Sequence, residues 1–272
     1  MAASENPSLA QLHRTFISAC HILHYHNVLD AYGHLSFRHP VDPDKFFMAR
    51  SIAPGTISSP GDVIEYYVAD AEPVDPTSAK GYAERCIHSE CYKRYPGVRA
   101  VIHSHSEAVL PYTISGVPLK PCYHMAGFLG SGVPVWDISD AYCDGDIKDL
   151  LVRDTRLGSS LAASLSRRID NNKTELPDHA VSLMRGHGFT VVAENMESCV
   201  LRAIYTQNNA SIQTMTLTIS AAFGGQTTQH DIKYLSVEEA AAAAQMTKWS
   251  AQRPWKLWLR EVEACGLYVN SA

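Results

Sequence analysis

The stretch Val101-Ile102-His103-Ser104-His105 decides how the chain is interpreted, because an apolar run ends there in two histidines one residue apart. Side chains at positions i and i+2 of a strand point to the same face, so a strand would direct His103 and His105 to one site. Two imidazoles are half of a metal site. A simpler explanation is that one histidine ends a strand and the other is a solvated loop residue. The rest of the chain must therefore supply a third ligand and an acid or base.

Length and composition predict a folded α/β protein. The 272 residues are 46% apolar and 19% charged, which is enough apolar material to bury a full core. Helical and strand patterns alternate with no internal repeat and no clear linker, so we expect a single domain over 1–272. Its core would span residues 10–222, followed by a helical C-terminal segment over 223–272.

Apolar spacing and turn residues predict the individual elements. Strands are expected over 34–38, 46–48, 63–68, 98–102, 180–184 and 189–193. Helices are expected from 9 to about 31–33 and over 81–95, 106–114, 157–169, 196–222 and 238–248, with loops and short strands over 116–144 and an exposed turn over 171–174. The C-terminal segment carries Trp255, Trp258 and Tyr268, so we expect it to close the pocket or to make a subunit contact.

Charge and cysteine usage narrow the partners and the compartment. A net charge of −5 without a Lys/Arg cluster argues against nucleic acid and favours a small molecule. We expect no membrane partner, because no stretch of about 20 apolar residues could span a bilayer and no N-terminal run resembles a signal peptide. The seven cysteines are scattered and never spaced as CxxC, as expected for reduced thiols in the cytoplasm.

Two further segments could complete the site. In Arg185-Gly186-His187-Gly188, a histidine lies between glycines at the tip of a predicted hairpin, where a ligand can approach the backbone; the alternative is a tight turn whose histidine is incidental. Glu84 opens the helix that precedes the histidine strand, although a carboxylate there is also favoured by the helix dipole alone. His88 lies one turn further along, and we interpret it as a packed histidine rather than a ligand.

Three histidines and a carboxylate suit Zn²⁺, which is the ion we expect, and also Fe²⁺, Mn²⁺ or Co²⁺. Three protein ligands and an open position would make such an ion a Lewis acid that polarises a carbonyl. The chain has no HExxH, no GxGxxG after a strand, no P-loop and no GxSxG, which argues against metalloproteases, common nucleotide-binding enzymes and serine hydrolases.

Taken together, Glu84-x-x-x-His88, the strand that ends His103-Ser104-His105 and the downstream Arg185-Gly186-His187-Gly188 before a long helix resemble the class II aldolase/adducin family. The resemblance covers residues 10–222. It implies an α/β/α sandwich around a mixed, largely antiparallel sheet, in a homotetramer with sites at subunit interfaces. By the same resemblance, His103, His105 and His187 would bind the metal, and Glu84 would be the acid/base.

The chain departs from the family's sugar-phosphate aldolases where those enzymes hold phosphate. Gly33-His34-Leu35-Ser36 stands where they carry an asparagine, and Tyr82-Ala83-Glu84 lacks the serines that precede their glutamate. A pocket poor in hydroxyl groups would leave a phosphate dianion short of donors. Phosphorylated sugars are therefore the weaker expectation.

The pattern is closer to the decarboxylase branch, which acts on ring-cleavage products of the 2-hydroxy-3-carboxymuconate semialdehyde type and on dihydroxyphthalates. The similar segments are 33–40, 49–51, 118–126 and 203–210. This resemblance makes His34, Arg38, Ser51 and His124 candidate contacts for a carboxylate or phenol. The simpler explanations are that Arg38 is a strand-surface charge and that His124 is a loop residue.

Breaking a C–C bond beside a carbonyl leaves a carbanion, and a metal on that oxygen would store the charge as an enolate. Loss of CO₂ needs no base, so Glu84 or a tyrosine would return a proton, whereas a retro-aldol reaction needs a group to take the hydroxyl proton. We expect a divalent-metal-dependent C–C lyase acting on a small carboxylated substrate, decarboxylase first and aldolase second. An Fe²⁺ oxygenase on the same scaffold or a non-catalytic adducin-like interaction module would also be compatible with the sequence.

Overall fold

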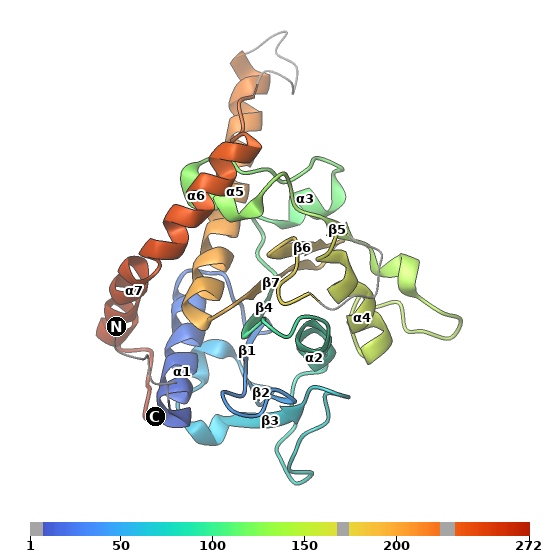
Figure 1. Ribbon diagram of the computed structural model, residues 1–272, viewed down its shortest axis with the longest axis vertical. Helices are drawn as coiled ribbons and strands as arrows, with labels where there is room; N and C mark the ends of the chain where they lie inside the picture. Colours follow the sequence, from blue (N-terminus) through green and yellow to red (C-terminus); the bar gives the residue numbers. More distant parts are fainter. Residues whose placement is uncertain (1–7, 168–173, 224–231) are drawn as a thin grey trace.

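The computed structural model describes residues 8–167, 174–223 and 232–272, and within these ranges a single sheet of seven strands is flanked by helices. The strand order is β3-β2-β1-β4-β7-β6-β5 (Figure 1). All neighbouring strands are antiparallel except β5 and β6, which are parallel, so the mixed, largely antiparallel sheet is confirmed. The strands are β1 His34–Arg38, β2 Lys45–Ala49, β3 Val63–Tyr67, β4 Ala100–Ser104, β5 Val135–Trp136, β6 Val181–Met184 and β7 Gly188–Ala193.

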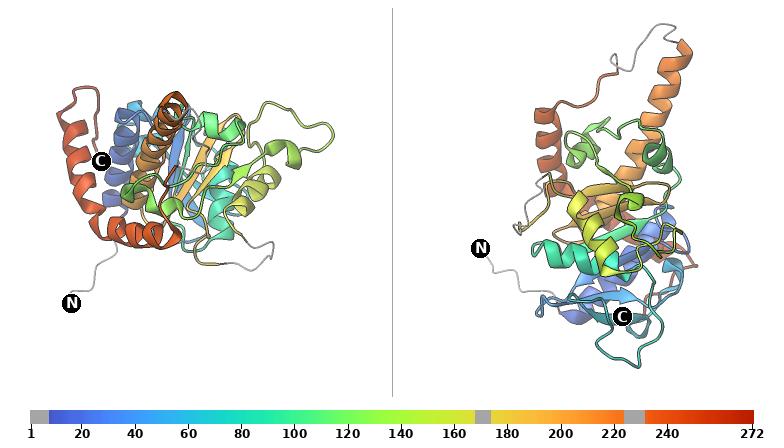
Figure 2. Two further views of the ribbon diagram at one scale, coloured as in Figure 1. Left: turned by 90° about the horizontal axis from the view of Figure 1, so that it is seen from above. Right: turned by 90° about the vertical axis from the view of Figure 1, so that its right-hand side faces the viewer.

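Helices cover both faces of this sheet, which confirms the α/β/α arrangement. Helices α1 and α5 lie on one face with α7 outside them, and α2 and α4 lie on the other (Figure 2). The helices are α1 Leu9–Tyr25, α2 Arg85–Arg94, α3 Leu110–Ile114, α4 Thr155–Ser164, α5 Met196–Phe223, α6 Val237–Ser250 and α7 Gln252–Ala264. Short 3₁₀ turns occur at Pro54–Thr56, Pro60–Asp62, His124–Leu129 and Ile138–Ala141.

The strand that carries His103 lies at the centre of the sheet. All five residues of β4 are buried, and β4 pairs with β1 on one side and with β7 on the other. In the β1–β4 register His34 is opposite His103. Polar side chains at the end of such a strand are held by the rigid core rather than by a loop, which suits a site that needs fixed geometry.

Local chemistry sets the ends of the helices, and several ends differ from the sequence prediction by four residues or more. Helix α1 begins with a capping box formed by Ser8 and Gln11 and stops before Asn27, whose φ of 55° is incompatible with a helix. Helix α2 begins at Arg85 rather than at Gly81, because Gly81 forms a β-bridge with Arg50 instead. Helix α3 begins four residues later than predicted. Helix α4 begins at Thr155 and ends at Ser164, so the helix predicted to run to 169 is too long. Of the expected turn over 171–174, residues 171–173 lie outside the described residues.

The C-terminal segment packs on α1 of its own chain. Tyr268 stacks on His21 and its hydroxyl lies 2.8 Å from Nδ1 of His24, while Trp255 and Trp258 are 8% and 6% exposed. These residues do not line the pocket beside the histidine strand, so the expectation that they close this chain's own pocket is wrong, whereas the alternative of a subunit contact stays a prediction. None of the described helices is long and apolar enough to cross a membrane. All seven cysteines are free thiols.

Candidate metal centre

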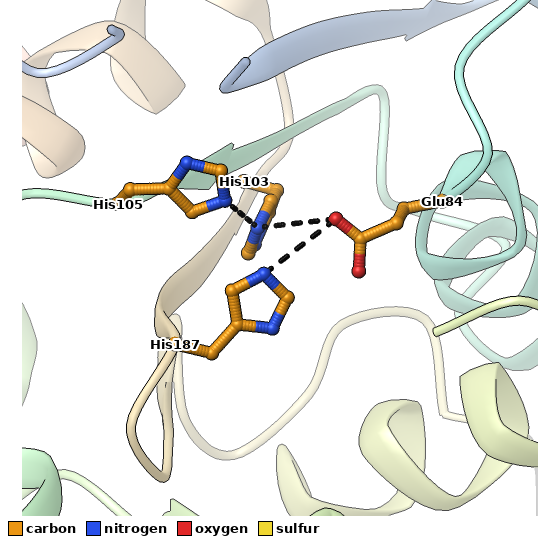
Figure 3. A group of neighbouring side chains, drawn as sticks. All are labelled: Glu84, His103, His105 and His187. Carbon is orange, nitrogen blue, oxygen red and sulfur yellow. Dashed lines mark hydrogen bonds and ion pairs between the residues drawn. The ribbon is translucent and has the colours of Figure 1, made fainter. Parts of the chain in front are cut away.

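Four side chains from three separate parts of the chain converge at the carboxyl end of β4 (Figure 3). His103 is the penultimate residue of β4 and His105 follows the strand. His187 lies in the turn between β6 and β7, and Glu84 is the N-cap residue of α2. The structure thus brings together the predicted ligands and the predicted acid/base.

Glycine is required for the β6–β7 turn to come this close to β4. Gly188 has φ 150°, and a Cβ atom on it would collide with the carbonyl oxygen of Ser104. Gly186, before His187, has φ 64°, in the left-handed region that glycine tolerates best. The two glycines therefore let His187 reach the end of β4, whereas the sequence pattern suggested that they make room for a ligand at the backbone.

The ligand atoms lie at the separations that one metal ion requires. Nε2 of His103 is 3.0 Å from Nε2 of His105. Oε2 of Glu84 is 3.7 Å from Nε2 of His103 and 3.6 Å from Nε2 of His187. All four atoms lie within 4.8 Å of one another. Bonds of about 2.1 Å in a tetrahedral site place ligand atoms about 3.4 Å apart, so the cluster has the right size.

Protonation also fits a cation at this place. His105 donates from Nδ1 to Oδ2 of Asp30 at 3.2 Å, which leaves the lone pair of its Nε2 facing the cluster. Burial, followed by the neighbouring imidazoles, holds the pKa of His103 well below its ordinary value, so His103 is neutral. Nε2 of His103 and Nε2 of His105 share a hydrogen bond in this structure, and a divalent ion would take the place of the shared hydrogen. The donor set therefore fits a divalent ion of the zinc type.

Asp30 is hydrogen-bonded to the ring nitrogen of His105 that points away from the cluster. Among the described residues, Nδ1 of His103 and Nδ1 of His187 are buried without a hydrogen-bond partner. Asp30 is thus the carboxylate that orients a cluster imidazole through its outer nitrogen. Its other oxygen, Oδ1, accepts from the backbone N–H groups of Tyr32 and Gly33 at 2.9 and 2.7 Å. Hydrogen bonds of this outer kind fix the tautomer and the ring orientation of metal-binding histidines.

The two carboxylate oxygens of Glu84 have different surroundings. Its Oε1 accepts from the backbone N–H of Val152 at 2.9 Å, and its Oε2 faces the imidazoles. The residue is only 6% exposed. This arrangement leaves one carboxylate oxygen for a metal ion or for a proton.

A pocket of about 420 Å³ opens beside the cluster. Besides cluster residues, its wall includes Tyr32, His34, Ser51, Tyr82, Leu150 and Leu151. Leu150 has φ 67°, a strained conformation for a branched residue that is found mainly where function demands it. Among the described residues, no lysine or arginine lines this pocket. The pocket therefore offers hydroxyl, imidazole and apolar surfaces to a ligand, together with the carboxylate of Asp149, which is paired with Arg153.

The four candidate substrate contacts divide into two pairs. His34 and Ser51 line the pocket. Arg38 lies at the far end of β1, where its guanidinium donates to backbone carbonyls that include those of Val98 and Tyr95 at 2.9 and 3.2 Å. His124 is exposed on a 3₁₀ turn. The expectation for Arg38 and His124 is thus corrected: in this chain neither reaches the pocket.

Sequence reasoning missed Asp30 and the loop residues Leu150 to Val152. Asp30 precedes Gly33 in a turn, so its pattern indicated a turn residue and gave no sign of the contact with His105, 75 positions away. His88 behaves as predicted for a packed residue: it is fully buried, and its Nε2 lies 2.7 Å from Nδ1 of His34.

Comparisons with known proteins identify the family of the chain. The family model "Class II Aldolase and Adducin N-terminal domain" matches residues 14–214. The chain is 52% identical over 260 residues to the decarboxylase tropJ of Talaromyces stipitatus, which covers 95% of this chain and 97% of that protein. It is 27% identical over 203 residues to the 3,4-dihydroxyphthalate decarboxylase of Rhodococcus jostii, covering 71% of this chain and 73% of that protein.

A solved structure shows the same fold. L-fuculose 1-phosphate aldolase from Glaciozyma antarctica superposes with a TM-score of 0.68 at 16% identity, over 96% of this chain and 94% of that one. The relatives support an enzyme with lyase activity, against a purely non-catalytic module. The match over residues 14–214 and the identity to tropJ over nearly the whole length lead to one conclusion: the chain belongs to the class II aldolase and adducin family.

Proposed function

We propose that the protein is a divalent-metal-dependent decarboxylase of a small carboxylated keto or hydroxy acid, and of a hydroxyaromatic acid in particular. The observation that carries the proposal is the convergence of Glu84, His103, His105 and His187 beside a pocket without cationic side chains among the described residues. A phosphate dianion would lack charged partners there. The names of the relatives, a decarboxylase and a dihydroxyphthalate decarboxylase, support the same choice.

His103, His105 and His187 would hold the ion, with Oε2 of Glu84 within reach of it. We expect Zn²⁺, although the same ligands also accept Fe²⁺, Mn²⁺ and Co²⁺. A divalent ion bound there would supply Lewis-acid polarisation of a substrate carbonyl or phenolic oxygen.

A side chain of the protein would supply the proton that the substrate needs after CO₂ has left. When the C–C bond to the carboxylate breaks, CO₂ leaves, the electron pair stays on carbon, and that carbon must receive a proton. Glu84 would hold this proton on Oε2, which is supported by the contact that occupies its Oε1, the hydrogen bond from the N–H of Val152. Tyr82 is a poorer source, since its hydroxyl donates to the carbonyl of Ile52 and burial raises its pKa.

The experiment is metal analysis of the purified protein together with CO₂ release from 3,4-dihydroxyphthalate and from a panel of ortho-hydroxy aromatic and β-keto acids. We expect about one ion per chain, CO₂ release that a chelator abolishes and Zn²⁺ restores, and loss of both ion and activity in His103→Ala and His187→Ala. Activity that survives complete removal of metal would refute the proposal. Aldehyde release without CO₂ would favour an aldolase, and oxygen uptake during turnover would favour an oxygenase.

We also propose that the protein is a homotetramer located in the cytoplasm. Helix α5 extends beyond the sheet (Figure 1), and Ile212, Met215 and Ile219 on it are 39%, 64% and 54% exposed. These three positions share one helix face, and an exposed apolar face of this kind is typical of a protein contact. Light scattering after size exclusion should give four times the chain mass, and a monomer mass would contradict the proposal.

A further inference from the structure

A buried chain of hydrogen bonds runs from the core to the pocket, and the chemistry above does not use it. The hydroxyl of Tyr92 lies 2.7 Å from Oγ of Ser36, and this Oγ lies 2.6 Å from Nδ1 of His88. Nε2 of His88 lies 2.7 Å from Nδ1 of His34, which lines the pocket. Tyr92, Ser36, His88 and His34 are each at most 2% exposed. Solvent therefore cannot supply missing partners along this chain.

The direction of the chain follows from Tyr92. Ser36 Oγ is the hydrogen-bond partner that the structure gives to the Tyr92 hydroxyl. A buried hydroxyl hydrogen without an acceptor costs about 1–3 kcal/mol, so the hydroxyl of Tyr92 donates to Ser36. The hydrogen of Ser36 then points to Nδ1 of His88. In the reverse direction, Ser36 would donate to Tyr92 and leave the Tyr92 hydrogen unpaired in the core.

The tautomers of both histidines follow from this direction. His88 accepts at Nδ1, so its one hydrogen is on Nε2, because burial lowers the pKa of His88 to about 3 and keeps the ring neutral. His88 therefore donates from Nε2 to Nδ1 of His34. A hydrogen on Nδ1 of His34 would face the hydrogen of His88 and is excluded on geometric grounds. The hydrogen of His34 is thus on Nε2, the ring nitrogen left for the pocket.

We propose that His34 is a fixed, uncharged hydrogen-bond donor to the substrate oxygen that becomes negative when CO₂ leaves, with its Nε2–H held in place by the Tyr92–Ser36–His88 chain. This role rests on the proposed decarboxylase function. His34 is well placed for it, because its ring centroid is 5.1 Å from that of His103, its partner across β1 and β4. Neutral imidazoles are used as such donors in other enzymes. A fixed donor of this kind selects an acid whose carboxylate lies next to an enol or phenol oxygen.

The first test is the tautomer itself, which requires neither metal nor substrate. Solid-state ¹⁵N spectra of histidine-labelled, metal-free protein distinguish Nε2–H from Nδ1–H, and difference spectra against His34→Phe assign the signals of His34. We expect His34 and His88 to carry their hydrogens on Nε2. Ser36→Ala should let both rings exchange tautomers. The matched control is Ser182→Ala, which removes an equally buried strand hydroxyl, bonded to Oγ of Ser164 at 2.7 Å, and should change neither ring.

The second test is kinetic, with the acid from the panel that releases CO₂ fastest. Loss of one donor to a developing oxyanion lowers kcat by about 10²–10³-fold, so we expect this loss in His34→Phe with KM nearly unchanged and the metal retained. His34→Gln keeps an N–H donor and should recover part of the loss, and Ser36→Ala should lower kcat about tenfold.

A wild-type His34 that carries its hydrogen on Nδ1, or a His34→Phe variant that keeps the wild-type kcat, would overturn the inference. If no acid of the panel releases CO₂ while the tautomers are as expected, the proposed function fails and the donor assignment stands. If His103→Ala is inactive and His34→Phe is fully active, the proposed function stands and the inference fails.

Discussion

Replacing Asp30 by asparagine should weaken metal binding without disturbing the turn that holds it. Asparagine keeps the oxygen that accepts from the N–H groups of Tyr32 and Gly33. It replaces Oδ2, the acceptor for Nδ1–H of His105 at 3.2 Å, by an NH₂ group that cannot accept. His105 then either loses its outer partner or moves its hydrogen to Nε2, which removes the lone pair that faces the cluster.

The size of the effect follows from the exposure of this contact. Loss of an outer partner of a metal-binding histidine typically lowers metal affinity about 10–100-fold. The side chain of Asp30 is 48% exposed, so water replaces part of what is lost. We therefore expect the lower end of the range, about tenfold in Kd, which corresponds to about 1.4 kcal/mol.

Competition with a chromophoric zinc chelator at pH 7 measures this Kd directly. The matched control is Asp75→Asn, because Asp75 also accepts from a backbone N–H two residues ahead, that of Thr77, and is exposed. The control should bind zinc as the wild type does. A Kd for Asp30→Asn within a factor of two of the wild-type value, with the fold intact, would refute the reasoning that Asp30 sets the tautomer of His105.

Three further predictions concern the stability of the fold and the oligomeric state. Gly188→Ala should lower the free energy of unfolding by about 3 kcal/mol or more, because the added Cβ collides with the backbone of Ser104 at an unfavourable φ. The control is Gly266→Ala, where a Cβ has open space and the free energy of unfolding should not change. Urea unfolding measures the free energy of unfolding of both variants. In metal-free protein the free energy of unfolding should fall as the pH drops below about 6.5, by up to about 3 kcal/mol per pH unit. The reason is that burial keeps His34 and His88 neutral in the folded protein, whereas the same two residues bind protons in the unfolded chain. A free energy of unfolding that stays constant from pH 7 to 5 would contradict this. Met215→Glu should dissociate the oligomer, and an unchanged mass by light scattering would exclude this helix face as the contact.

The sequence was informative where a local pattern has a single structural meaning. Alternation predicted β1 with its observed ends, and the i, i+2 spacing predicted that His103 and His105 share a site, whereas the addition of His187 and Glu84 came from the family resemblance. Arg38 was misassigned because the backbone carbonyls that bind its guanidinium carry no signal in the sequence. The contact between Asp30 and His105 depends in the same way on tertiary packing, which no local pattern specifies.

The hydrogen bond from the Val152 N–H to Glu84 links the shape of the pocket wall to the position of the Glu84 carboxylate. Leu150 and Leu151, just before Val152, form part of the pocket wall and so affect the size of the ligand that fits. Exchanging these two side chains alters the shape of the pocket and leaves the support of the carboxylate in place. An insertion or deletion in the same loop would instead shift the Val152 N–H, so that a change made for a bulkier substrate would also move Glu84, the proposed proton donor.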